Sequence, residues 1–127
     1  MTNVEIVSAY MNAVLLDRDL AAAETFWGPD LIQHNPTMPN GQQVLREFIA
    51  NRPCDFRYEK GVIMGDGDLV MAHGRYVGLA EKPLIAVDIF RVEDGRIVEH
   101  WDIMQEEIPA SDSINGNAMF PIGMAPR

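Results

Sequence analysis

Residues 87–102 read VDIFRVEDGRIVEHWD, and this stretch decides the fold. Two runs rich in apolar residues flank the turn at residues 93–95, and Asp-Gly between alternating runs is a strong signal of a β-hairpin. Side chains two positions apart share one face of a strand. One face of the predicted hairpin therefore carries Ala86, Asp88 and Phe90 from the first strand and Val98, His100, Asp102 and Met104 from the second.

Three titratable groups, Asp88, His100 and Asp102, interrupt this otherwise apolar face. An ionised carboxylate on an apolar face is costly unless it is paired. Two interpretations follow. Either the face is wet and the carboxylates are solvated, as charged groups usually are, or the face lines a cavity with titratable groups at its floor.

The composition limits the class of protein. The 127 residues fit one domain, and a hydrophobic fraction of 47% is enough for a core. A formal net charge of −9 argues against nucleic acid or an anionic membrane as a partner, since both attract clustered Lys and Arg. The single cysteine, Cys54, excludes an intramolecular disulfide. With no apolar run of about 18 residues and no signal-peptide pattern, we expect a cytoplasmic protein.

The order of the predicted elements indicates an α+β fold. Apolar residues recur at helical spacing in three segments, and alternating runs separated by turn signals follow them. The expected elements are helices at 3–18, 20–27 and 42–51, a short extended piece at 31–36, strands at 54–64 and 69–79, and the hairpin. We expect three N-terminal helices packed on a curved antiparallel sheet of about four long strands plus a short one, which leaves a cone with one open end.

We expect residues 1–108 to form this domain and residues 109–127 to form a C-terminal tail. The tail has no periodicity but carries several large apolar side chains, which are Met119, Phe120, Ile122 and Met124. A solvated tail is normally poor in such residues. The tail is therefore expected to dock on its own domain or on a second copy of the chain.

Four segments together resemble the nuclear-transport-factor-2-like (NTF2-like) superfamily, and within it the SnoaL-like polyketide cyclases. They are the first helix, His34-Asn35-Pro36, residues 87–91 and residues 95–102. The resemblance covers residues 1–108, and the hairpin is its most specific part. It implies a cone-shaped α+β barrel and a homodimer formed sheet to sheet.

The resemblance also implies roles for single residues. Asp102 matches the aspartate that acts as acid and base in the aldol condensation of the cyclases, and Asp88 matches the place of its assisting group, which is a histidine in the best-known cyclase. Tyr10 and Asp88 match the oxyanion pair of the ketosteroid isomerases. Asn35 stands where those isomerases have their basic aspartate, and an amide accepts no proton at neutral pH. Ala86 stands where the limonene-type epoxide hydrolases have an arginine.

The residues and the resemblance together predict an acid–base enzyme that acts on a small to medium hydrophobic carbonyl compound, by an aldol-type cyclisation or an isomerisation. Asp102 is the expected base, Asp88 is expected to keep its proton and donate a hydrogen bond, and His100 is the third catalytic candidate. The expected substrate-binding residues are Tyr10, Trp27, His34, Asn35, His73, Phe90 and Met104. No cofactor is expected, since the chain has no Gly-rich phosphate loop and no nucleotide fingerprint.

Three alternatives stay open at this point. The chain could be a pocketed binding protein without catalysis, or an epoxide hydrolase in which paired carboxylates hold a water molecule. His73, His100 and Asp88 could also form a non-haem iron site, but their spacing does not demand one, and we expect no metal. His34 and His73 have structural interpretations too, as a loop-capping side chain and as a hydrogen-bonded core histidine.

Overall fold

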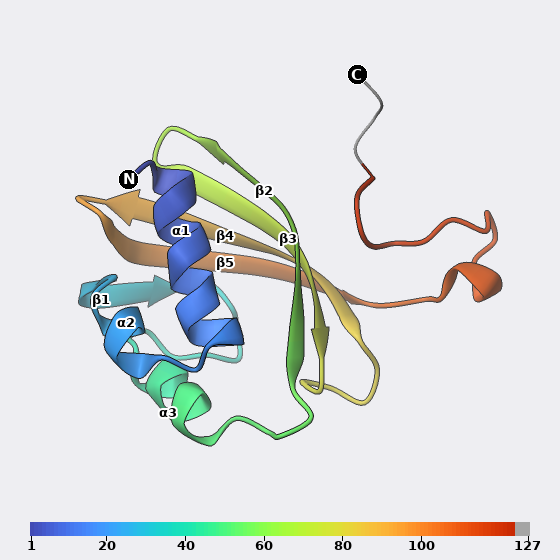
Figure 1. Cartoon of the computed structure of the whole chain (residues 1–127), viewed down its shortest axis with the longest axis horizontal. Coiled ribbons are helices and arrows are strands. Elements are labelled where there is room, and N and C mark those ends of the chain that lie inside the picture. The colour runs from blue at the N-terminus through green and yellow to red at the C-terminus, as the bar shows by residue number, and fades with distance from the viewer. Residues whose placement is uncertain (124–127) are drawn as a thin grey trace.

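Three helices cover the concave side of one five-stranded sheet (Figure 1). The structure is a computed structural model and describes residues 1–123; the end of the predicted tail, including Met124, lies outside the described residues. The elements are α1 Asn3–Met11, a π-helical turn Asn12–Leu16, α2 Leu20–Glu24, β1 Trp27–Gln33, α3 Gln43–Asn51, β2 Arg57–Asp66, β3 Leu69–Val77, β4 Leu84–Glu93, β5 Arg96–Glu106 and the 3₁₀ turn Ala110–Asp112. The predicted α+β class, with helices first and sheet after, is confirmed.

The described strands form an open sheet in the order β1-β5-β4-β3-β2. Strands β2 to β5 are antiparallel neighbours, as predicted for a meander. Strand β1, the short one, instead pairs in parallel with β5. A parallel pair needs a long connection, and here that connection includes α3 and three strands. The sheet is strongly curved (Figure 1) but unclosed, so the expected barrel is a half-wrapped sheet closed by helices.

The hairpin of β4 and β5 has the predicted turn and register. Asp94 and Gly95 both have positive φ, at 50° and 76°, which is the geometry of a tight two-residue hairpin turn. Asp88 lies directly opposite Asp102. Alternation placed Val98 on the inner face with His100, and this puts Ile97 on the outer face, which is wrong. Ile97 is fully buried, because the register shifts after Arg91 and a β-bulge reverses the side-chain alternation.

The N-terminal helix is shorter than predicted and ends in irregular geometry. A capping box between Thr2 and Glu5 starts α1. After Met11 the helix widens into a π-helical turn that ends at Leu16, and Arg18 adopts a φ of 50°. The chain around Trp27, predicted as the end of a second helix, is the start of β1.

The outer face of the sheet carries ion pairs as well as apolar side chains, and some of the apolar side chains are exposed. Met71 is 42% exposed on β3 and Ile103 is 68% exposed on β5. After β5 the chain extends away from the helices as a long arm (Figure 1), and Phe120 of this arm packs against His73 with 5.4 Å between ring centroids. The homodimer through this face stays a prediction. Among residues 1–123, no helix has the length and apolar character that crossing a membrane requires.

Candidate active site

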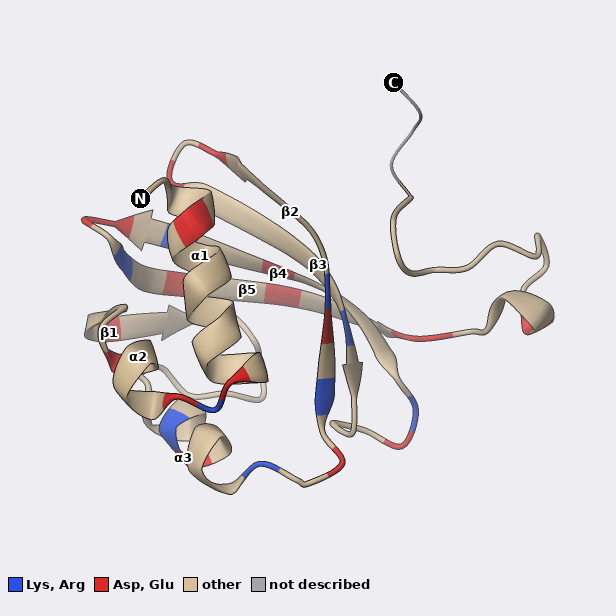
Figure 2. Cartoon of the chain, viewed as in Figure 1, with Lys and Arg blue, Asp and Glu red and all other residues tan. Residues whose placement is uncertain are grey.

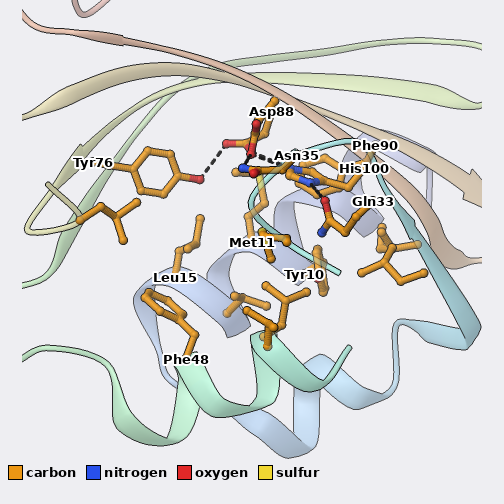
Figure 3. Close-up of a pocket in the computed structure, with 18 of the residues that line it drawn as sticks. Tyr10, Met11, Leu15, Gln33, Asn35, Phe48, Tyr76, Asp88, Phe90 and His100 are labelled. Atoms are coloured by element: carbon orange, nitrogen blue, oxygen red, sulfur yellow. Dashed lines mark hydrogen bonds and ion pairs between the residues drawn. The ribbon is translucent and has the colours of Figure 1, made fainter. Parts of the chain in front are cut away.

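A cavity of about 360 Å³ lies between the concave face of the sheet and the helices. Leu15, Leu45 and Phe48 line its apolar end, while polar groups of β4 and β5 lie on its sheet side. Figure 3 shows Tyr76 and His100 on either side of Asp88, with the side chains of α1 and α3 below them. The predicted cavity with titratable groups on its wall therefore describes this face better than a solvated surface does, since Asp88 is only 3% exposed.

Asp88 has both carboxyl oxygens engaged by protein groups. Tyr76 Oη donates to Oδ2 at 2.7 Å, and His100 Nε2 lies 2.8 Å from Oδ1. The Tyr76 hydroxyl is a donor, and the contact with His100 can be made with the proton on either partner. Asp88 therefore fixes the positions of Tyr76 and His100, and its expected role as a proton-bearing donor to substrate stays a prediction.

His100 is held at both ring nitrogens. Its Nδ1 lies 2.9 Å from Gln33 Oε1, while its Nε2 contacts Asp88 and lies 4.0 Å from Asp102 Oδ2. Sequence reasoning missed Gln33 and Tyr76 as members of this network. Tyr76 could have been found from its place on the inward face of β3, but Gln33 could not, because its position depends on the parallel pairing of β1 with β5.

Asp102 is held at one oxygen and open at the other. Asn35 Nδ2 donates to Asp102 Oδ2 at 2.8 Å, and Asn35 Oδ1 accepts from the backbone and the hydroxyl of Thr37. Within residues 1–123 no hydrogen bond is made to Asp102 Oδ1. The side chain is 8% exposed and lines the cavity. A carboxylate with one fixed and one open oxygen can act as a general base on a bound molecule.

Tyr10 presents a neutral hydroxyl to the same cavity. Trp27 Nε1 donates to the Tyr10 oxygen at 3.0 Å, and the ring packs edge-on against Phe90 with 5.8 Å between centroids. Burial, together with the nearby charge of Asp88, raises the pKa of Tyr10 well above its ordinary value. Because Trp27 occupies the oxygen as a donor, the hydroxyl proton remains available to a ligand oxygen.

Three of the predicted substrate-binding residues lie outside the cavity. Trp27 acts through Tyr10 and is not part of the lining. His34 lies on the outer side of β5, where it pairs with Glu99, and His73 lies on the outer face of β3 against the C-terminal arm. These positions correct the predictions for His34 and His73. Strand alternation directs the ring of His73 away from the helices, and His34 lies one residue beyond the end of β1, on the outer side. The other predicted residues of this set line the cavity: Tyr10, Asn35, Phe90 and Met104.

The titratable groups of the cavity could approach a cation, but Asp88 and His100 are already paired with protein groups. One ligand atom each of Asp88, His100 and Asp102 lies within 4.8 Å of the others. The oxygens of Asp88 and the nitrogens of His100 are all engaged with protein partners. An open metal site needs free lone pairs that converge on one point, so this arrangement favours a hydrogen-bond network. The alternative with His73 fails, because that ring is on the opposite face.

Acidic residues are also conspicuous within the strands that form this site. Figure 2 shows acidic segments within β4 and β5, away from the strand ends. None of the cavity-lining residues among the described part of the chain is Lys or Arg. The cavity therefore offers hydrogen bonds and negative charge, with no counter-charge for an anionic ligand.

Comparisons with known proteins agree with this architecture. The family model described as the SnoaL-like domain matches residues 7–100. Among solved structures, IdmH from Streptomyces antibioticus, a candidate polyketide cyclase, is 22% identical with a TM-score of 0.63, over 82% of this chain and 92% of that one. A candidate ketosteroid isomerase from Kribbella flavida is 17% identical with a TM-score of 0.70, over 82% and 78% of the two chains.

A third similar structure is an LEH-like epoxide hydrolase from M. tuberculosis. It is 21% identical with a TM-score of 0.63, over 90% of this chain and 87% of that one. At these identities the likenesses show the fold alone. No curated protein matches the chain.

Proposed function

This chain belongs to the family of SnoaL-like domains, and from that premise we propose that it is an acid–base enzyme. Its substrate is a small to medium hydrophobic carbonyl compound, and the reaction is an aldol-type cyclisation or an isomerisation. One observation carries the proposal: the open oxygen of Asp102 and the available proton of Tyr10 lie on the wall of one predominantly apolar cavity. A base and an oxyanion donor are what removal of a proton beside a carbonyl requires.

The reaction begins when Asp102 takes a proton from the carbon next to the substrate carbonyl. The electrons of the broken C–H bond move onto the carbonyl oxygen, and Tyr10 stabilises the resulting enolate by donating a hydrogen bond. In a cyclisation, the enolate carbon attacks a second carbonyl of the same molecule, and the new alkoxide takes the proton back from Asp102. In an isomerisation, Asp102 returns the proton to a different carbon.

The surrounding network positions the base. Asn35 fixes one oxygen of Asp102, so the other oxygen keeps one direction. Asp88, held by Tyr76, fixes the ring of His100 close to Asp102. Both ring nitrogens of His100 are engaged, so the ring keeps one orientation beside Asp102. Because these groups are already oriented, they need not reorganise during the reaction as water molecules would.

The test is the exchange of a substrate proton with solvent. A panel of uncharged ketones and diketones is incubated with the protein in D₂O, and deuterium uptake next to the carbonyl is followed by NMR. Asp102→Asn removes the base at nearly constant volume, and we expect uptake to fall by roughly 10²–10⁴-fold. Asp112→Asn, an exposed change in the C-terminal arm, serves as the matched control and leaves the rate unchanged.

The outcome separates this proposal from its alternatives. Full exchange activity in folded Asp102→Asn protein would refute the assignment of the base. A ligand that binds tightly and is recovered unchanged, with variants altering affinity only, points to a binding protein. Incorporation of ¹⁸O from labelled water into an epoxide points to hydrolysis.

A further inference from the structure

A cluster on the outer face of the sheet lies directly behind the candidate base. The imidazole of His34 stacks flat on Trp101, with 4.7 Å between ring centroids and 2° between planes. Its Nε2 also lies 2.7 Å from Glu99 Oε2. Arg91 completes the cluster from the far side, with Nε 2.9 Å from Glu99 Oε1 and its guanidinium 5.6 Å from the Trp101 ring. His34 is therefore fixed by a stacking contact and a hydrogen bond at once.

The residue after His34 reaches the opposite side of the sheet. The backbone N–H of His34 donates to the carbonyl of His100 at 3.0 Å, the last ladder bond before the chain leaves β1. Asn35 then directs its amide inward to Asp102. His34 and Asn35 are neighbours in the chain but lie on opposite sides of β5. The side chain of His34 is held on the outer face, and the side chain of Asn35 is held by the candidate base on the inner face.

We propose that His34 is a positioning residue for Asp102, acting through Asn35. The inference rests on the proposed function for its catalytic consequence, but its structural content does not depend on it. The outer cluster holds the backbone at residue 34, and this fixes the origin of the Asn35 side chain. A fixed amide keeps its hydrogen bond to Asp102 Oδ2 and so holds the orientation of this carboxyl group on the cavity wall.

The need for such an anchor follows from the local sequence. Strand β1 ends at Gln33, so the ladder no longer restrains Asn35. Pro36 has no N–H and restricts Asn35 to extended geometry, but it forms no bond that sets the position of the segment. On the C-terminal side, a turn restrains Asn35 through hydrogen bonds from Thr37 to its side-chain oxygen and from the backbone N–H of Met38 to its carbonyl. The contacts of His34 supply the restraint on the N-terminal side.

The hydrogen bond between His34 and Glu99 is strengthened by the negative charge of Glu99. The hydrogen bond from His34, and after it the bonds from Arg91, hold the pKa of Glu99 below its ordinary value. Glu99 is thus an ionised acceptor that is itself tied to β4 through Arg91. The anchor of His34 is a part of the sheet and not a mobile surface side chain.

The experiment compares His34→Ala with wild-type protein in two measurements. The first is the side-chain ¹⁵N–¹H signal of Asn35, whose amide protons exchange slowly with water while they bind Asp102. We expect exchange to become roughly tenfold faster in His34→Ala, as expected for a lost hydrogen bond of about 1.4 kcal/mol. The second is the deuterium-uptake assay, in which kcat falls roughly 10-fold to 100-fold while KM changes little, because a small displacement of a base slows the chemical step.

Two further variants keep the comparison informative. His34→Gln retains a donor toward Glu99 without the ring; recovery of the Asn35 signal in this variant assigns the effect to the hydrogen bond, and continued loss assigns it to the stacking on Trp101. Glu107→Gln weakens the other ion-pair cluster of the outer face, around Arg75, and we expect it to leave Asn35 unchanged. Should His34→Ala fail to fold, His34→Leu, which also lacks the donor and the aromatic ring, carries the same measurements.

An unchanged Asn35 signal in both His34 variants would overturn the inference, whatever the enzyme does. Full deuterium uptake by Asp102→Asn would refute the proposed function and leave the Asn35 measurement valid. The two ideas therefore fail in different experiments. If the signal changes but kcat does not, the anchor is structural only, and the positioning role is refuted.

Discussion

Tyr10 combines a structural and a chemical role in one hydroxyl. Its oxygen accepts the indole N–H of Trp27, and its proton is available to the cavity. Tyr10→Phe removes both. We expect deuterium uptake to fall by about 10²-fold, the typical effect of losing one oxyanion donor. We also expect the free energy of unfolding to fall by about 1–3 kcal/mol, because the buried N–H of Trp27 loses its partner.

The two effects in Tyr10→Phe can be separated by a second change. Trp27→Phe removes the indole donor and leaves the Tyr10 hydroxyl in place, so its stability loss should not be accompanied by a comparable loss of exchange rate. Urea unfolding and deuterium uptake are measured on both variants. Equal loss of rate in the two would mean that packing around Tyr10, and not its proton, matters to the reaction.

Single residues were predictable where they depended on strand alternation. The inward orientation of Asp88, His100 and Asp102 followed from the hairpin alone, since its turn sets the register. His34 was misplaced because β1 ends one residue before it, at Gln33, and local sequence does not show on which side of β5 it lies. Asn35 was expected to contact substrate, and its bond to Asp102 depends on a tertiary contact across 67 positions.

At the level of elements, β2 and β3 pack closely around one glycine. Tyr58 of β2 lies across Gly74 of β3, where an added Cβ would be 2.1 Å from the Tyr58 hydroxyl oxygen. Gly74→Ala must therefore displace this buried ring. We expect a loss of about 1–3 kcal/mol in the free energy of unfolding, as for other overpacked cores.

Gly28→Ala is the matched control for this prediction. Gly28 also lies in a strand, but the nearest atoms to an added Cβ belong to Arg96 and Val98 at 3.9 Å, an ordinary contact distance. We expect no loss of stability there, and the comparison by thermal unfolding isolates the steric effect of Tyr58. A Gly74→Ala protein as stable as Gly28→Ala would show that the Tyr58 ring moves without cost.

The elements themselves were predictable to different degrees. The hairpin and the preceding strand carry local signals, namely alternation and turns with Gly, and they were placed correctly. Strand β1 has no such local signal. Its pairing is parallel and depends on β5, which is distant in the chain. The π-helical turn after Met11 continues the same apolar spacing as an α-helix, so periodicity alone could not distinguish them.

At the level of the whole molecule, all three tyrosines of the chain are buried around one acidic group. Tyr76 donates to Asp88, Tyr58 packs on Tyr76 with 4.7 Å between ring centroids, and Tyr10 lines the same cavity. Burial is the main cause that raises the pKa of each, and the charge of Asp88 adds to it. The fold therefore stabilises the neutral form of these hydroxyls.

This arrangement predicts a fold that loses stability at high pH. The ordinary tyrosine pKa is 10.0, and below that pH the folded and unfolded chains bind the same tyrosine protons. Above it the unfolded chain releases protons that the folded chain still holds, so each tyrosine lowers the free energy of unfolding by up to about 1.4 kcal/mol per pH unit. Urea unfolding between pH 9 and 12 measures this slope, and Tyr58→Phe should reduce it by about a third of the tyrosine contribution. Tyrosinate absorbance that rises near pH 10 in protein still fully folded by circular dichroism would contradict the prediction, because it would mean that the hydroxyls ionise inside the intact fold.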